Sequence, residues 1–197
     1  ALIEQLPLEL TTQACIDAGV ASAQAAYAAA LAAIPDGQAK AQGIAVGQAA
    51  AAAILHLRAD DGAVGPFLNF ACPQDTEPGE YQCTPGTPLV VFEGWNNVVP
   101  FVLHHSAQFR PGPPYAVDRQ KYTADFNEVK SLGGDGVTTP SARTADETEI
   151  ALYWWESSPL KWNRVARTVS ADQGVTLWEN ARLFGLLNMA LADGYIA

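Results

Sequence analysis

The sequence predicts an all-α protein, a helical bundle of about six helices with one long loop rich in proline, glycine and aromatic residues. Three observations predict this class. Apolar residues recur at helical spacing in both halves of the chain. Two capping-box motifs mark helix starts in the second half. Most of the 13 prolines fall between residues 62 and 114. We therefore expect one helical domain over 1–197, with an alanine-rich helix pair at 1–61, a wrapping loop at 62–114 and a four-helix region at 115–197.

Composition limits what the chain can be. Its 197 residues suit one domain, and 49% hydrophobic with 16% charged residues exclude a disordered chain. The net charge of −10, without any basic run, argues against a nucleic-acid or anionic-membrane partner. No continuous apolar run reaches the roughly 18 residues of a membrane span. We therefore expect no nucleic-acid partner and no membrane span.

The first helix has Thr11 or Thr12 as its cap and ends at Pro35-Asp36-Gly37. Cys15 lies in this pattern and is predicted to be a small core residue. A second helix follows from about residue 38 to residue 59. Small residues recur on it every fourth position, which predicts a tightly packed helix pair. The apolar stripe of the first helix and the small residues of the second are Ile16, Val20, Tyr27, Leu31, Ile34, Gly43, Gly47 and Ala51.

The loop at 62–114 contains two of the three cysteines, Cys72 and Cys83. A disulfide between them would close a short ring and stabilise the fold by roughly 2–3 kcal/mol in an oxidising compartment. Two free thiols are the alternative. The sequence opens at Ala1 without a methionine or a leader, which favours a processed chain or a fragment. We expect a secreted or periplasmic location.

Helical signals return after the loop. A helix is predicted over 118–132, ending at Gly133-Gly134. Thr144 with Glu147, and Thr176 with Glu179, are capping boxes that open two further helices. Between them, Ser158-Pro159 starts a helix that should turn Trp162, Val165 and Val169 inward. Asn188 falls on the apolar stripe of the last helix, so its amide requires hydrogen-bond partners.

No motif for chemistry stands out. The histidines His56, His104 and His105 lack further ligands at metal-binding spacing. Ser106 is not part of a nucleophile elbow. The acidic residues after Thr144 are explained by the first turn of a helix, where the dipole favours carboxylates. We therefore predict no catalytic, cofactor-binding or metal-binding residue in this chain.

Several blocks in order nevertheless resemble one family, the bacterial vanadium-dependent haloperoxidase-like proteins of the type 2 phosphatidic acid phosphatase superfamily. The resemblance covers nearly the whole chain after about residue 25. The blocks include Ala29 to Gly37, Lys40 to Gly47, Leu57 to Gly62, Pro78 to Tyr81, Pro100 to Leu103, Gln108 to Pro114, Tyr122 to Lys130, Arg143 to Ala145, Trp162 to Arg167, Glu179 to Phe184 and Leu187 to Ala190.

The resemblance implies a protein of two helical bundles, with the vanadate or phosphate pocket in the second. That pocket uses a Lys and Arg stretch, a Ser-Gly-His stretch and a later Arg and His. This chain has no Ser-Gly-His. It is therefore similar to the N-terminal, non-catalytic half, and no catalytic residue can be carried over. Whether the full-length protein is a haloperoxidase, oxidising halide with peroxide, or an acid phosphatase stays open.

The resemblance also implies partners. The first is the catalytic C-terminal half, in the same or a cleaved chain, and vanadate is the cofactor implied for the full-length family. Support of a homodimer is a further expectation. Candidate partner or channel contacts are Gln108, Phe109, Arg110, Asn163 and Asn188. The alternative is a stand-alone, non-enzymatic helical binding protein whose loop aromatics form a ligand groove. Its first candidates are Trp95, Tyr115, Trp154 and Trp155.

Overall fold

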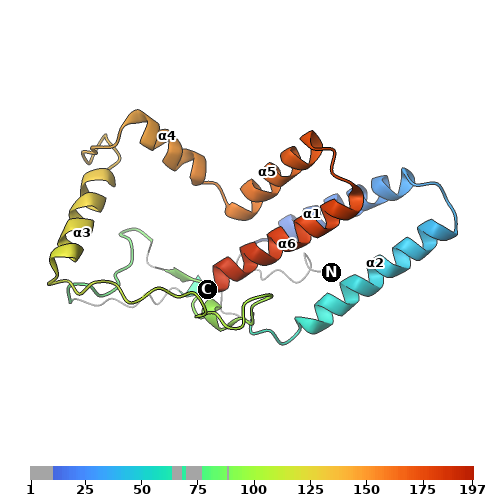
Figure 1. Cartoon of the computed structure of the whole chain (residues 1–197), viewed down its shortest axis with the longest axis horizontal. Helices are drawn as coiled ribbons and strands as arrows, with labels where there is room; N and C mark the ends of the chain where they lie inside the picture. Colours follow the sequence, from blue (N-terminus) through green and yellow to red (C-terminus); the bar gives the residue numbers. More distant parts are fainter. Residues whose placement is uncertain (1–10, 64–67, 70–76, 88) are drawn as a thin grey trace. The chain divides into compact units, whose positions relative to one another are not determined.

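The computed structural model describes residues 11–63, 68–69, 77–87 and 89–197, and this part of the chain is mostly helical (Figure 1). It contains six α-helices, as the sequence predicts, together with one 3₁₀ turn and two very short strands. The elements are α1 (Gln13–Ala32), α2 (Gln38–Leu57), β1 (Leu68–Asn69), β2 (Val90–Val91), η2 (Trp95–Asn97), α3 (Gln120–Leu132), α4 (Ala145–Trp154), α5 (Ser158–Asp172) and α6 (Leu177–Ile196).

Two compact units make up the chain. The first comprises Ala1–Pro73 with Cys83–Val98, and it holds α1, α2, the strands and η2. The second comprises Gln74–Gln82 with Val99–Ala197, and it holds α3 to α6. Each unit is therefore built mainly from one half of the chain, with short exchanged segments.

Helix starts follow the local sequence signals. At α4, the Glu147 backbone N–H donates to Thr144 Oγ1 at 3.2 Å, and the Thr144 N–H donates to Glu147 Oε2 at 2.7 Å. At α6, Thr176 and Glu179 make the same reciprocal pair at 3.3 and 3.0 Å. Both predicted capping boxes are thus confirmed. Thr12 caps α1 by accepting a hydrogen bond from a backbone N–H one turn later.

The first helix pair is open rather than tightly packed. A Cβ added at Gly43 or Gly47 would meet no atom within 4 Å. Cys15 is exposed, so its prediction as a core residue is wrong, whereas Ile16 is buried. The physical reason is that Gly and Ala permit close approach without driving it, because they bury little apolar surface. The turn between the helices is instead held by Lys40, whose ammonium contacts Asp36 Oδ1 at 2.8 Å.

Helix α1 bears on the expectation that the chain has no membrane span. It is 20 residues long with a mean hydropathy of 1.2, so it could cross a membrane by length and composition alone. That expectation was based on continuous apolar runs. The many alanines of α1 give the helix a high mean hydropathy although it contains one charged residue, Asp17. A core helix of a soluble protein and an N-terminal signal sequence have the same properties, so α1 is only a weak indication of a span.

Within the loop, β1 and β2 pair antiparallel, with Leu68 opposite Val91. Cys83 is disulfide-bonded and Cys15 is free. Cys72, the other cysteine of the expected bridge, lies outside the described residues. Gly62 has a φ of +90°, and an added Cβ there would come 3.1 Å from the Asn97 carbonyl oxygen, so the chain needs glycine at this turn.

In the second unit, Arg143 joins α3 to α4. Its Nη1 donates to the carbonyl oxygen of Leu132, in the last turn of α3, and its Nε donates to Thr148 Oγ1 at 3.4 Å. Ser141 Oγ donates to the same Leu132 oxygen at 3.0 Å. Cationic and hydroxyl donors at this position satisfy a carbonyl that the helix itself leaves unpaired. The connection between the two helices is therefore specified by side chains.

Helices α5 and α6 form an antiparallel hairpin, and of the described helices they make the most extensive pairing. Their turn is fastened by Asn180, whose Nδ2 donates to the Val175 carbonyl oxygen at 3.1 Å and whose Oδ1 accepts from the buried Ser170 hydroxyl. The apolar face of α5 is less covered than predicted. Trp162 is 41% exposed and Val169 is 52% exposed, so the prediction that both point inward is wrong.

Candidate functional site

Two of the predicted contact residues meet on the α5–α6 hairpin. Asn163 Nδ2 donates to Asn188 Oδ1 at 3.0 Å, and Asn188 Nδ2 donates to Asn163 Oδ1 at 3.2 Å. Each amide also donates to a carbonyl four residues earlier on its own helix, at 2.8 Å. Asn188 is exposed, so burial does not force this pairing, and its amide nevertheless bonds to another side chain of this unit. The pair fixes the register of the two helices.

The other three predicted contact residues form a separate turn. The His104 backbone N–H donates to Gln108 Oε1 at 2.8 Å, and the Gln108 N–H donates to the His105 carbonyl at 3.1 Å. Phe109 is 73% exposed, and Arg110 is exposed beside it. This turn therefore presents an aromatic ring and a cation to solvent, and Gln108 has a structural role within it.

A buried carboxylate that the sequence reasoning missed anchors the segment before this turn. Asp193, on the last part of α6, is 5% exposed. Its oxygens accept backbone N–H groups of Phe101 at 2.6 Å, Val102 at 2.8 Å and Leu103 at 3.0 Å. A carboxylate holding consecutive backbone amides is a strong, charge-assisted arrangement. The signal in the sequence was an acidic residue in the last turn of a helix, where the dipole disfavours a carboxylate.

A second missed residue is Lys161, on the first turns of α5, which is only 2% exposed. Among the residues that the structure describes, its ammonium has no hydrogen-bond acceptor. It lies instead 3.8 Å from the centre of the Tyr153 ring and 5.0 Å from that of Trp154. Aromatic faces attract a cation more strongly when water is excluded. The contact ties the start of α5 to the end of α4.

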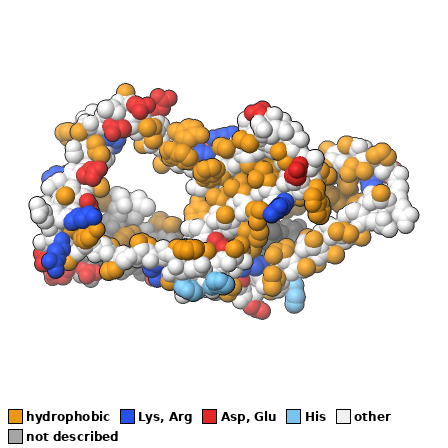
Figure 2. All heavy atoms as spheres, in the orientation of Figure 1, with side chains coloured by type: hydrophobic (Ala, Val, Ile, Leu, Met, Phe, Trp, Pro, Cys, Tyr) orange, Lys and Arg blue, Asp and Glu red, His pale blue; other side chains and the backbone are white. Residues whose placement is uncertain are grey.

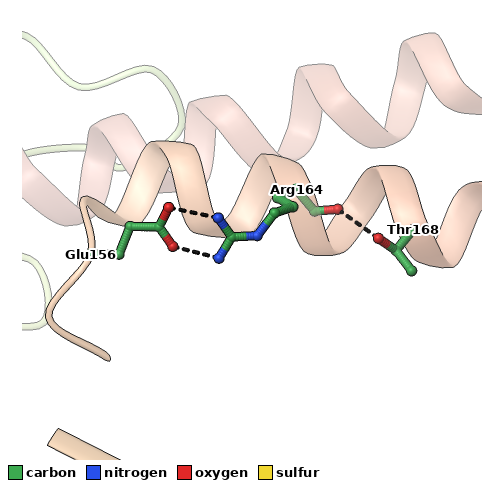
Figure 3. Close-up of polar contacts among 3 residues, drawn as sticks. All are labelled: Glu156, Arg164 and Thr168. Atoms are coloured by element: carbon green, nitrogen blue, oxygen red, sulfur yellow. Dashed lines mark hydrogen bonds and ion pairs between the residues drawn. The ribbon is translucent and has the colours of Figure 1, made fainter. Parts of the chain in front are cut away.

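An ion pair lies on the exposed side of the same helix (Figure 3). Arg164 makes two parallel contacts with Glu156, at 2.6 and 2.5 Å. Hydrogen bonds from the guanidinium lower the pKa of Glu156, and the carboxylate raises the pKa of Arg164. The Arg164 carbonyl accepts from Thr168 Oγ1 at 3.2 Å. The guanidinium is therefore held in a fixed bidentate geometry.

Two further cations have local partners. Arg58 pairs with Asp61 at 2.7 Å, and Lys121 lies 4.7 Å from the centre of the Tyr115 ring. Among the residues that the structure describes, no group of three or more His, Cys, Asp and Glu side chains is placed to hold a metal ion.

Aromatic side chains are more exposed than a core position requires. Trp155 is 87% exposed, Trp154 53% and Tyr115 49%, while Trp95 is half-buried. Trp154 contacts Tyr153 edge-on, with ring centres 5.1 Å apart. Trp95 belongs to the first unit and the others to the second, so no common groove is assigned to them.

No protein-family model, curated protein or solved structure matches this chain.

Proposed function

We propose that this chain is the N-terminal structural half of a vanadium-dependent haloperoxidase-like protein, or of a related acid phosphatase, and that it works by packing against a catalytic half. The proposal joins the ordered sequence blocks with one structural observation. Large apolar side chains are exposed along α4, α5 and α6, and apolar atoms cover much of the visible face of the molecule (Figure 2). Trp155, Leu177 and Trp178 are 87%, 89% and 84% exposed.

The extent of exposure supports a missing partner surface. Three of these side chains, Trp155, Leu177 and Trp178, are each more than 80% exposed. Large apolar side chains left open in this way are typical of interaction surfaces. The catalytic half is the partner that the family resemblance suggests.

In this proposal the present half supplies shape and rigidity. The Asn163–Asn188 pair and the Asp193 anchor set the geometry of α5, α6 and the segment before Phe109. The exposed ring of Phe109 and the guanidinium of Arg110 are our candidates for contacts with the partner or with a substrate channel. The oxyanion would be bound by Lys, Arg and His residues of the other half.

The test is the mass and activity of the native protein. We expect peptides of this sequence in a polypeptide well above 20.9 kDa, or in a stable complex with a second chain. That preparation should oxidise bromide with vanadate and peroxide, or hydrolyse a phosphate monoester, whereas the 197-residue chain alone should do neither. A native species of 20.9 kDa, or activity in the isolated chain, would overturn the proposal.

A second candidate is a stand-alone binding protein that uses exposed aromatics, and the exposure of Trp154 and Trp155 favours it. Binding of the dye ANS separates the two. An incomplete half should bind ANS strongly and self-associate, because its partner face is open. A complete binding protein should be monomeric and bind little dye.

A further inference from the structure

We infer that the α4–α5 corner, residues 153–167, binds a protein segment that carries a carboxylate beside an apolar side chain, and that Lys161 recognises the carboxylate. The inference deepens the proposed function and rests on it for the source of the segment, which is the partner half. It starts from the burial of Lys161, which is 2% exposed. Within the described part of the chain, its ammonium finds no hydrogen-bond acceptor.

The aromatic contacts of Lys161 meet only part of what an ammonium requires. Its Nζ lies 3.8 Å from the centre of the Tyr153 ring and 5.0 Å from that of Trp154. The ring faces attract the charge, but an ammonium also has three N–H groups to donate. A buried charge ordinarily has a hydrogen-bonding or ionic partner. The unfilled requirement is therefore an anionic oxygen, which an incoming carboxylate supplies.

The local charge also favours an acidic occupant. Glu156, between α4 and α5, is already engaged, because its two carboxylate oxygens contact the Arg164 guanidinium at 2.6 and 2.5 Å (Figure 3). Residues 153–167 carry one acidic side chain, Glu156, and three basic ones, Lys161, Arg164 and Arg167, so their net charge is 3 − 1 = +2. The whole chain carries −10. The corner thus has the sign of charge that attracts an acidic segment.

Large apolar side chains on the same corner are open to solvent. Trp155 is 87%, Leu160 64% and Trp154 53% exposed. Trp162, whose ring centre lies 6.0 Å from that of Trp154, is 41% exposed. Tryptophan side chains around a desolvated charge are the composition of a binding hot spot. An occupant that covers them needs apolar groups as well as its carboxylate, so a peptide segment fits better than a free inorganic anion.

The ammonium lies close to the surface although it is buried. The two rings that contact it belong to Tyr153 and Trp154, which are 54% and 53% exposed. Exposed side chains change rotamer within nanoseconds. We expect a rotation of the Trp154 side chain to open the path by which a carboxylate reaches Lys161 Nζ.

The test uses the 197-residue chain and two tripeptides blocked at both ends, Leu-Asp-Leu and Leu-Asn-Leu. Binding is followed by tryptophan fluorescence in dilute solution. Wild type should bind the acidic peptide at least about tenfold more tightly than the neutral one. Lys161→Met keeps an apolar side chain of similar length, so it should bind both peptides equally, with unchanged helicity by circular dichroism.

Lys121→Met is the matched control. Lys121 also lies over an aromatic ring, 4.7 Å from the centre of Tyr115, but it is exposed, so the variant should keep the preference for the acidic peptide. If Lys161→Met loses helicity, Trp155→Ala carries the test. Trp155 is 87% exposed, so its removal should leave the fold intact and weaken binding of the acidic peptide about fivefold.

Three results would overturn the inference: equal binding of the two peptides by wild type, a preference that persists in a folded Lys161→Met variant, or an equal response to inorganic phosphate. Unchanged binding by Trp155→Ala would do the same. Each of these results would leave the proposed function standing, because none of them measures the mass or activity of the native protein. A native species of 20.9 kDa would overturn the proposed function while the peptide preference remained.

Discussion

Asp193→Asn tests whether a single carboxylate holds the segment at Phe101–Leu103 against α6. Three backbone N–H groups donate to its two oxygens, at 2.6, 2.8 and 3.0 Å. The asparagine side chain keeps one acceptor oxygen. Its NH₂ group, which takes the place of the other oxygen, cannot accept hydrogen bonds from the backbone N–H groups. Hydrogen bonds to a charged group contribute about 1.5–3 kcal/mol each. Losing two of them, in a partly buried place where water reaches some donors, should lower the free energy of unfolding by about 3 kcal/mol.

The assay combines urea unfolding with amide hydrogen exchange. Exchange at Phe101, Val102 and Leu103 should accelerate more than a hundredfold, since each 1.4 kcal/mol of lost protection is a factor of ten. Asp125→Asn is the control, because it removes the same charge from the exposed side of α3 and should change stability by less than about 0.5 kcal/mol. Unchanged exchange at the three amides in Asp193→Asn would refute the anchoring role.

Three further outcomes can be measured on the same protein. Asn163→Ala and Asn188→Ala should show a coupling of about 1 kcal/mol in a double-mutant cycle, and additive effects would contradict the reciprocal pair. Hydrogen bonds from the cap residues lower the pKa of Glu147 and Glu179, so stability should fall as pH drops below their ordinary value of 4.5 and through their folded values. Replacing both residues, Glu147→Gln and Glu179→Gln, should reduce this loss of stability at low pH. Leu177→Glu should reduce ANS fluorescence without lowering the unfolding midpoint, because Leu177 is 89% exposed at the start of α6.

Local signals in the sequence predicted local structure well. The capping boxes at Thr144 and Thr176 are formed as expected, and the six helices lie close to their predicted ranges. These features depend on hydrogen bonds between residues three or four positions apart, so the information is present in a short window.

Burial was predicted poorly, and the reason is physical. An apolar stripe shows which face of a helix is able to be buried, but a second surface must come to cover it. Val169 and Trp162 lie on such a stripe of α5 and remain half exposed. Cys15 is exposed, and Gly43 and Gly47 face open space, for the same reason: no second surface covers them.

The candidate contact residues were predicted as a set without their partners. Asn163 and Asn188 are 25 positions apart, so nothing in a local window pairs them. The same holds for Asp193, whose partners lie about 90 residues earlier. Lys161 was missed because a lysine early in a helix is normally solvated, and only the packing of Tyr153 against it reveals a buried ammonium.

The Asp193 anchor also sets an order of events during synthesis. Its hydrogen bonds span 90 to 92 positions of the chain. At about 5–20 residues per second, the ribosome needs roughly 4 to 18 seconds to make that length. The amides of Phe101, Val102 and Leu103 must wait that long for their carboxylate, with the exposed ring of Phe109 close by in the sequence. Until α6 has emerged, the segment at Phe101–Leu103 therefore lacks the carboxylate that holds it in the folded chain.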